Sequence, residues 1–441
     1  MKQKTKFKQT EIGMIPEDWE VDKLKNHLII KGRIGWKGLK KSEYLQDGYA
    51  IINGEQIIED NIDWINVGRI TKERYDESPE IILKQDDILM TKDGTIGKLA
   101  YLEELPEPAT VASGVFVIRN NSKKLNQRYL YYYFKSNFFK WLVESRLEGS
   151  VVPHLYQRDI VELNIPLPSM LEQEMISLIL YDLDRKIKLN QSENATLETI
   201  GRAIFKHWFI DFEFPNEEGK PYKSSGGEMI DSEFGKIPKG WSVKRLNNLL
   251  KSIESGRRPQ GGIDQTLKAG IPSIGAENVN GLGFYEYSST KYISQEYFEQ
   301  MKQGVVKDND VLLYKDGAQL GRKTMFGKGF PFSICCVNEH VFILRANEKL
   351  NQVFLYFWLD QNKITENIKN LNANSAQPGI NKESVGTLEI IVPEKRILNL
   401  FEKIIKFVIE KIFLNCLESQ NLAQIRDSLL PKLMSGKVRV V

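Results

Sequence analysis

Residues 170–208 read MLEQEMISLILYDLDRKIKLNQSENATLETIGRAIFKHW. Apolar side chains follow a four-then-three spacing along this run, at Ile176, Leu180, Leu183, Ile187, Leu197 and Ile204. This spacing is typical of a coiled-coil seam. It predicts an α-helix of about 38 residues, or about 57 Å at 1.5 Å per residue. A helix with one apolar stripe buries that stripe, so we expect a partner helix of similar length.

The partner is a second copy of the same pattern near the C-terminal end of the chain. Its apolar positions are Phe401, Ile405, Val408, Ile412, Leu422 and Leu429. Asn190 and Asn415 occupy equivalent seam positions. We predict that the helices pack as an antiparallel coiled coil in which the two asparagines meet and fix the register, at some cost in stability. The alternative is that both asparagines face solvent where the seam is interrupted.

The repeat extends over the whole chain, and its landmarks recur in one order at a nearly constant offset. The segment Gly13–Pro16 with Trp19 recurs as Gly235–Pro238 with Trp241. Lys92-Asp93-Gly94 recurs as Lys315-Asp316-Gly317, and Leu125-Asn126-Gln127 recurs as Leu350-Asn351-Gln352. Residues 27–80 and 250–305 barely resemble each other. We interpret the shared parts as a frame and the divergent parts as surfaces that vary independently.

Each half begins with about 155 residues of short apolar runs broken by Gly, Asn and Asp, which indicates β structure with some helix. Asp93-Gly94 is a tight-turn signal. Ser169 and Glu172 have capping-box spacing at the start of the first long helix. The fold class is therefore α+β, with two tandem mixed domains, each followed by a long helix. The predicted segments are a first mixed domain at 1–168, its helix at 169–213, a linker at 214–234, a second mixed domain at 235–393, and a second helix with the C-terminal tail at 394–441.

Composition sets broad limits on the class of protein. Hydrophobic residues make up 41% and charged residues 27%, which is ordinary for a globular chain. The net charge of +3 excludes a strongly basic coat but leaves room for local basic patches. No apolar window is long enough to span a bilayer, and the N-terminal residues lack the apolar core of a secretory signal. The three cysteines, Cys335, Cys336 and Cys416, form no disulfide framework, so we expect a cytoplasmic protein with free thiols.

Motifs of catalysis are missing from the sequence. It contains no GxxxxGK[ST] phosphate loop, no HExxH, no CxxC, no nucleophile elbow and no Asn-Pro-Pro-aromatic methyltransferase segment. None of the four histidines has metal-ligand spacing with a cysteine. We therefore predict no catalytic residue, no metal site and no cofactor in this chain.

Basic residues beside glycines and aromatic residues are the candidates for DNA contact, because Arg and Lys supply charge and base-edge donors. In the first half they are Lys31, Arg33, Trp36, Lys37, Lys40, Arg69, Lys92 and Lys98. In the second half they are Arg257, Arg258, Lys315, Gln319, Arg322 and Lys323. The alternatives are solvated loops, exposed hairpin polarity and, for Trp36, a place in a local core. The outward faces of the long helices carry mixed charge, with Glu172, Asp182, Arg185 and Lys188, which suits partner contacts or simple solvation.

The whole chain resembles the specificity subunit of a Type I restriction–modification system. The resemblance rests on the Gly-x-Ile-Pro and Trp opening of each half, on the segment 92–98, on Ile165-Pro166-Leu167-Pro168, on the segment 208–214, and on the closing segment 429–437. The second half departs from the pattern, since Glu394-Lys395-Arg396 stands where the first half has Ser169 to Gln173.

The resemblance implies two target recognition domains, each reading one half of a bipartite site on double-stranded DNA, and two helices as a spacer. It also implies binding to methyltransferase subunits, of which two equivalent frame copies predict two, and to a restriction motor–nuclease subunit. S-adenosylmethionine, ATP and Mg²⁺ would belong to those partners. The competing interpretations are a fused restriction or methylation enzyme of another type, and a scaffold that binds only protein.

Overall fold

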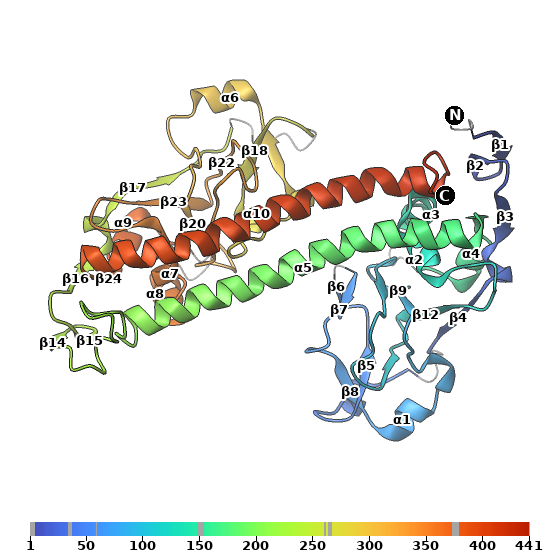
Figure 1. Ribbon diagram of the computed structural model, residues 1–441, viewed down its shortest axis with the longest axis horizontal. Helices are drawn as coiled ribbons and strands as arrows, with labels where there is room; N and C mark the ends of the chain where they lie inside the picture. Colours follow the sequence, from blue (N-terminus) through green and yellow to red (C-terminus); the bar gives the residue numbers. More distant parts are fainter. Residues whose placement is uncertain are drawn as a thin grey trace. The chain divides into compact units, whose positions relative to one another are not determined.

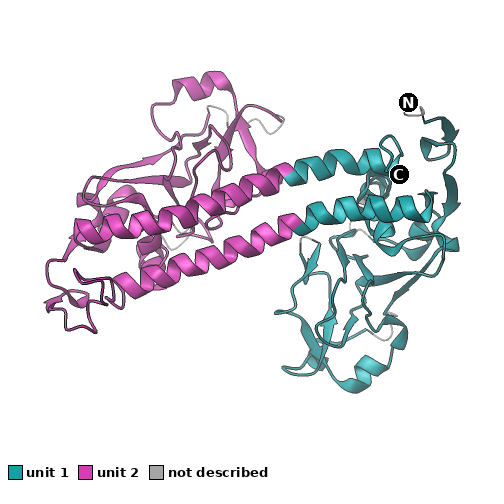
Figure 2. Cartoon of the chain, in the orientation of Figure 1, with its two compact units in different colours: residues 1–185, 422–441 teal, residues 186–421 magenta. Residues whose placement is uncertain are grey.

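In a computed structural model the chain forms two compact units (Figure 2). The structure describes residues 5–33, 38–58, 60–147, 154–259, 262, 267–372 and 379–440. Unit 1 comprises residues 1–185 and 422–441, and unit 2 comprises residues 186–421. Each unit therefore contains residues from both halves of the sequence repeat.

Unit 1 has the following strands: β1 (Phe7–Thr10), β2 (Gly13–Pro16), β3 (Glu20–Lys23), β4 (Leu28–Gly32), β5 (Tyr49–Ile52), β6 (Ile57–Ile58), β7 (Asn61–Ile62), β8 (Gly68–Ile70), β9 (Ile88–Thr91), β10 (Leu99–Tyr101), β11 (Ala109–Val111), β12 (Val115–Asn120) and β13 (Asn164–Leu167). Its short helices are α1 (Lys72–Asp76), α2 (Gln127–Lys135), α3 (Asn137–Leu147) and α4 (Gln157–Val161). The long helix α5 (Met170–Phe209) starts in this unit.

Unit 2 has the following strands: β14 (Met229–Ser232), β15 (Gly235–Pro238), β16 (Ser242–Arg245), β17 (Leu250–Ser255), β18 (Ile271–Ile274), β19 (Lys291–Ile293), β20 (Val311–Tyr314), β21 (Lys323–Met325), β22 (Cys336–Val337), β23 (Val341–Ala346) and β24 (Glu389–Val392). Its short helices are α6 (Gln295–Gln300), α7 (Gln352–Leu359), α8 (Asn362–Asn370) and α9 (Lys382–Gly386). The second long helix, α10 (Lys395–Met434), starts here and ends in unit 1 (Figure 1).

The two units share one strand topology, which confirms the mixed α+β fold class. The four-stranded antiparallel sheet has the order β10-β9-β12-β4 in unit 1 and β21-β20-β23-β17 in unit 2. The three-stranded sheets β11-β5-β8 and β22-β18-β19 also correspond, each with one parallel and one antiparallel pair. These smaller sheets include parts of the segments that differ most in sequence, so sequence divergence has not changed the frame there.

One helix packs on each four-stranded sheet, and its start explains a repeated tripeptide. Asn126 caps α2 by accepting hydrogen bonds from two backbone amides, and Asn351 caps α7 by accepting from Phe354 N at 2.7 Å. The following glutamine, Gln127 or Gln352, accepts from the backbone of the last residue of β12 or β23. Capping satisfies amides that a helix start leaves unpaired.

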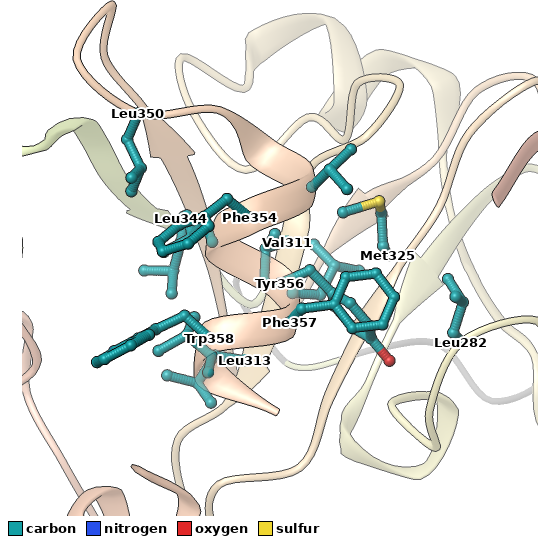
Figure 3. Close-up of a cluster of buried hydrophobic side chains, with 14 of the residues drawn as sticks. Leu282, Val311, Leu313, Met325, Leu344, Leu350, Phe354, Tyr356, Phe357 and Trp358 are labelled. Carbon is teal, nitrogen blue, oxygen red and sulfur yellow. The ribbon is translucent and has the colours of Figure 1, made fainter. Parts of the chain in front are cut away.

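Aromatic side chains fill the space between α7 and its sheet. Figure 3 shows Phe354 and Trp358 of α7 gathered with Leu313 of β20 and Leu344 of β23. All four side chains are almost fully buried. Burial of large apolar side chains on this scale, at about 1.5–3 kcal/mol each, holds the helix to the sheet.

The two long helices form as predicted and pack together. In unit 1, Ile176 and Leu180 of α5 share a core with Leu433 of α10. In unit 2, Phe205 of α5 shares a core with Phe401 of α10. Since earlier residues of one helix meet later residues of the other within each unit, the packing is antiparallel.

The predicted capping box forms only in part. The backbone amide of Glu172 donates to Ser169 Oγ at 3.2 Å. Its carboxylate, only 3% exposed, instead accepts from Trp19 Nε1 at 3.0 Å and from Arg439 Nε at 2.6 Å. The expectation that Glu172 faces outward is therefore wrong, because its charge is satisfied inside unit 1 by the C-terminal tail.

Unit 2 builds the corresponding junction from aromatic residues. Trp241, the counterpart of Trp19, stacks on Phe214 with ring centroids 4.8 Å apart. Phe214 is 3% exposed and stands in the segment expected to be a linker. Later in that segment, β14 pairs with β15. This connection is thus folded onto unit 2 from its first residue.

Both seam asparagines are buried, Asn190 at 0% and Asn415 at 1% exposure, which excludes the solvent-facing alternative. Asn190 Nδ2 lies 3.4 Å from the backbone oxygen of Asn415 and 2.9 Å from Glu418 Oε2. Asn415 Nδ2 lies 2.9 Å from Asn194 Oδ1. Each amide thus finds a polar partner on the opposite helix, which is the geometry that a register-setting residue requires.

We predict that replacing Asn190 and Asn415 together with Leu raises the thermal midpoint but loosens the register. Leucine removes two buried amides and adds apolar contact, whereas the amides find their partners on the opposite helix only in the native register. Cysteine pairs placed across the helices in native and shifted registers would report the distribution by cross-linking. A variant that cross-links only in the native register would contradict the role assigned to the asparagines.

Candidate nucleic-acid interface

The repeated Lys-Asp-Gly tripeptide forms the same turn in both units. Lys92-Asp93-Gly94 follows β9, and Lys315-Asp316-Gly317 follows β20. Gly94 has φ +69° and Gly317 has φ +79°, in the left-handed region that favours glycine. The turn leads back into an antiparallel strand in each unit, as the sequence predicts. It presents a lysine at the same place in both.

Each of these lysines lies over an aromatic ring. Lys92 Nζ is 5.0 Å from the centroid of Phe116, and Lys315 Nζ is 5.0 Å from that of Phe342. Such a cation–π contact restricts the position of an ammonium group without neutralising its charge. Lys98, on the other side of the first turn, donates to the backbone oxygen of Gly54 at 3.2 Å.

A histidine contacts the aspartate of each turn. His154 Nδ1 bonds to Asp93, and His340 Nδ1 lies 2.9 Å from Asp316 Oδ2. These histidines lack metal-ligand spacing in the sequence, and their pairing with the aspartates was not predicted from it. The repeat offers no signal for them, because the residue that it aligns with His154 is Gly379.

In unit 2 a chain of polar contacts links two of the predicted DNA-binding residues. Arg258 Nη2 is 2.6 Å from Glu339 Oε1, which lies 3.3 Å from His340 Nε2. His340 contacts Asp316, whose neighbour Lys315 has its ammonium 4.0 Å from that carboxylate. Arg258 and Lys315 therefore border one polar cluster, which we call the turn cluster.

Other candidates keep exposed positions. The Arg257 side chain beside the turn cluster is exposed, and its backbone oxygen accepts from Tyr297 at 3.0 Å. Lys31 on β4 and Lys40 are exposed as well. Trp36 and Lys37 lie outside the described residues. DNA contact by the exposed residues stays a prediction.

Two arginine candidates of the first half have internal partners. Arg33 is 1% exposed, and its Nε donates to the backbone oxygen of Val111 at 3.2 Å. Burial lowers the pKa of Arg33, with Glu77 3.8 Å away as a counter-charge. A side chain so enclosed has no donor to offer a base, so we withdraw Arg33 as a DNA contact. Arg69 pairs with Glu107 at the unit surface.

The remaining candidates lie around a cleft in unit 2 with a volume of about 1380 Å³. The turn residues Gln319 and Arg322 line it, together with Arg202 of α5 and Lys363 of α8. Both turn side chains are exposed, and Arg322 Nη1 lies 2.5 Å from Asn280 Oδ1. The basic lining of this cleft is compatible with an anionic ligand.

Lys323 also borders this cleft, but its side chain is almost fully buried. It is 6% exposed and donates to the backbone oxygen of Leu359 at 2.8 Å and to Thr365 Oγ1 at 2.6 Å. Asp360 lies 3.8 Å away. The predicted DNA contact is withdrawn here too, because the ammonium is enclosed by α7 and α8. Its counterpart at the start of β10 is Leu99.

Within the described part of the chain, no group of three or more His, Cys, Asp or Glu side chains is placed to hold a metal ion. No helix there is long and apolar enough to cross a membrane. The three cysteines are free and buried, and burial raises the pKa of Cys336 to about 11.

Replacing Lys323 with Leu is predicted to remove a pH-dependent part of the stability. Burial lowers the pKa of Lys323 to about 8, below the unfolded value of about 10.4. The penalty for holding the charge is complete below pH 8 and disappears as the pH rises to about 10.4. The variant's advantage in free energy of unfolding should therefore shrink by about 1–3 kcal/mol between pH 7 and pH 10.

Urea unfolding at the two pH values measures this difference, with Lys403→Leu as a control at an exposed site. An equal difference at pH 7 and pH 10 would show that Lys323 does not carry the penalty. DNA affinity should be unchanged at pH 7, since the side chain is enclosed.

Comparison with known proteins identifies the family. Residues 16–199 and 238–423 each match the family described as Type I restriction modification DNA specificity domain. The chain is 29% identical over 446 residues to the Type I restriction enzyme MjaIX specificity subunit of Methanocaldococcus jannaschii, covering 99% of this chain and 97% of the relative. It is 24% identical to the HindI specificity subunit of Haemophilus influenzae, covering 81% and 87% of the two chains.

The fold agrees with a solved structure. The S subunit of the Type-I restriction-modification system from M. genitalium superposes with a TM-score of 0.56 at 16% identity, covering 98% of this chain and 99% of that one. Two matched domains joined to two long helices account for nearly the whole sequence, and the chain belongs to the family of Type I restriction–modification DNA specificity subunits.

Proposed function

We propose that each unit reads one half of a bipartite site on double-stranded DNA. The observation that carries the proposal is a shared strand topology combined with divergent sequence at residues 27–80 and 250–305. A constant frame holds two readers in the same fold, while different side chains on the divergent segments can select different bases. Phosphate contacts from the frame would set position, and base contacts from the divergent segments would set sequence.

The helices α5 and α10 are the elements that we propose set the spacing between half-sites. Each runs for 40 residues without interruption and contributes side chains to the cores of both units. A continuous helix has a fixed rise per residue, so its length sets a fixed distance, which a flexible loop would not. The buried asparagines on the seam would keep the two helices in one register.

Catalysis is assigned to partners: methyltransferase subunits and a restriction motor–nuclease act with this chain on DNA, as in its family. S-adenosylmethionine, ATP and Mg²⁺ would be bound by those subunits. Support comes from the sequence, which has no phosphate loop and no methyltransferase segment. Because host DNA is the substrate, the complex would work in the cytoplasm.

Two methyltransferase subunits per chain are proposed from the outer faces of the long helices. Leu189 and its repeat counterpart Leu414 are 60% and 58% exposed. Ile200 and its counterpart Ile425 are 44% and 47% exposed. Large apolar side chains exposed at matching positions of both helices would give two equivalent apolar docking surfaces.

Exchange of one domain tests the reading function. Replacing residues 1–168 with the first domain of another family member should change one half-site and leave the other half-site and the spacer length unaltered, because the second reader and the helices are retained. Methylation sequencing of a host that carries the complete system measures all three at once. A change in both half-sites would refute independent reading.

A charge placed on each helix tests the stoichiometry. Leu189→Glu and Leu414→Glu should each reduce the complex from two methyltransferase subunits to one, because a buried carboxylate opposes docking. The double variant should bind none. Native mass spectrometry counts the subunits, and Lys188→Glu, which adds negative charge beside Leu189 without removing an apolar side chain, is the matched control. If both single variants kept two subunits, docking would lie elsewhere.

A further inference from the structure

The aspartate of each Lys-Asp-Gly turn lies between two positions of the chain. These two positions make the same backbone hydrogen bonds in both units, but different residues occupy them. Lys92 N donates to Gly114 O at 2.9 Å, and Lys315 N donates to His340 O at 3.1 Å. Leu155 N donates to Lys92 O at 2.9 Å, and Ile380 N donates to Lys315 O at 3.0 Å. Gly114 therefore corresponds to His340, and His154 to Gly379.

The two units have exchanged the occupants of these positions. In unit 1 the histidine precedes Leu155 and the glycine precedes β12, whereas in unit 2 the histidine precedes β23 and the glycine precedes Ile380. A Cβ on Gly114 would lie 3.8 Å from the Asp93 carboxylate, and one on Gly379 would lie 3.1 Å from that of Asp316. Both flanks thus face the same aspartate, and each unit keeps one imidazole against it.

An aspartate with no other partner would pair with the lysine beside it and neutralise the lysine's charge. Asp-Gly suits the tight turn, but it places a carboxylate next to a cation. The closest approach in unit 2 is 4.0 Å, between Lys315 Nζ and Asp316 Oδ2. The histidine gives the carboxylate a different partner, and the ring of Phe116 or Phe342 holds the ammonium in place.

We propose that the histidine engages the turn aspartate so that Lys92 in unit 1 and Lys315 in unit 2 stay available to a DNA backbone phosphate. His154, His340 and the two aspartates are positioning residues, and the lysines make the contact. A phosphate is the ligand that fits, because the arrangement is the same in two units whose divergent segments differ, and only the backbone is common to two half-sites. The inference rests on the proposed reading of DNA.

Unit 1 is the better unit for the test. Gly114 has room for a side chain at ordinary contact distance, so the histidine can be moved there. The variants are Lys92→Met, His154→Gly, the relocation pair Gly114→His with His154→Gly, and the suppressor pair Asp93→Asn with His154→Gly. Each is made in the full chain, assembled with its methyltransferase subunits. The probes are a duplex carrying both half-sites mapped by methylation sequencing, and a duplex of scrambled sequence.

Lys92→Met should weaken binding to both probes by a similar factor, about threefold to tenfold, and reduce the salt slope of log Kobs by about one. His154→Gly should weaken binding about twofold to fivefold, because Asp93 then forms a surface ion pair with Lys92. The relocation pair should restore wild-type affinity. The suppressor pair should also restore it, since no carboxylate remains to compete for the lysine. The methylated sequence should be unchanged throughout.

Four results would overturn the proposal, and the last of them is unaffected variants of a selective wild-type complex. If Asp93→Asn failed to suppress His154→Gly, the imidazole would act directly or only as a brace. If Lys92→Met relaxed the half-site sequence, the lysine would contact a base. If affinity followed the thermal midpoint across the series, the pair would serve folding alone. A wild-type complex that bound the two probes equally would count against the reading of DNA itself, whereas normal wild-type selectivity with unaffected variants would count only against this inference.

Discussion

Each long helix ends inside a core that belongs mainly to the other half of the sequence. Phe209, near the end of α5, packs against Phe354 and Phe401 of the second half, with ring centroids 4.8 and 4.9 Å apart. Leu433, near the end of α10, is buried in unit 1 with Ile176. A half of this chain on its own would expose these side chains. Neither long helix can therefore be removed without exposing apolar side chains of a core, so we expect the helices and the cores to unfold cooperatively.

A tryptophan that recurs in both halves lies at each of these junctions, and the junctions tolerate different chemistry. Trp19 donates to Glu172, which also pairs with Arg439 of the C-terminal tail. Trp241 instead stacks on Phe214. In unit 1 an ionic network raises the pKa of Arg439 and holds the tail at that residue, and in unit 2 an aromatic stack holds the connection between halves. The tryptophan is constant because its size fills the junction, while its partner varies with the segment that arrives there.

The sequence allowed the helices, the antiparallel seam, the turn at Asp93-Gly94 and the α+β class to be predicted, because periodicity and turn chemistry are local properties. The DNA contacts predicted at Arg33 and Lys323 were wrong, because residue type does not indicate burial. Both side chains donate to backbone oxygens inside a unit. It missed the histidine contacts for a different reason. Repeat comparison aligns residues by offset, whereas the imidazoles reach the same carboxylate from two different stretches of chain.

This difference between aligned residues and equivalent contacts bears on how such a frame evolves. The three-stranded sheets keep their order although the segments that form them have diverged, because a sheet is fixed by backbone pairing and by which side chains are buried, such as Ile51 in β5 and Ile274 in β18. Exposed positions on the same strands carry no such constraint. A duplicated frame can therefore change the surfaces that we propose contact DNA. Its buried contacts, and even the placement of a single imidazole against an aspartate, are preserved as geometry rather than as sequence.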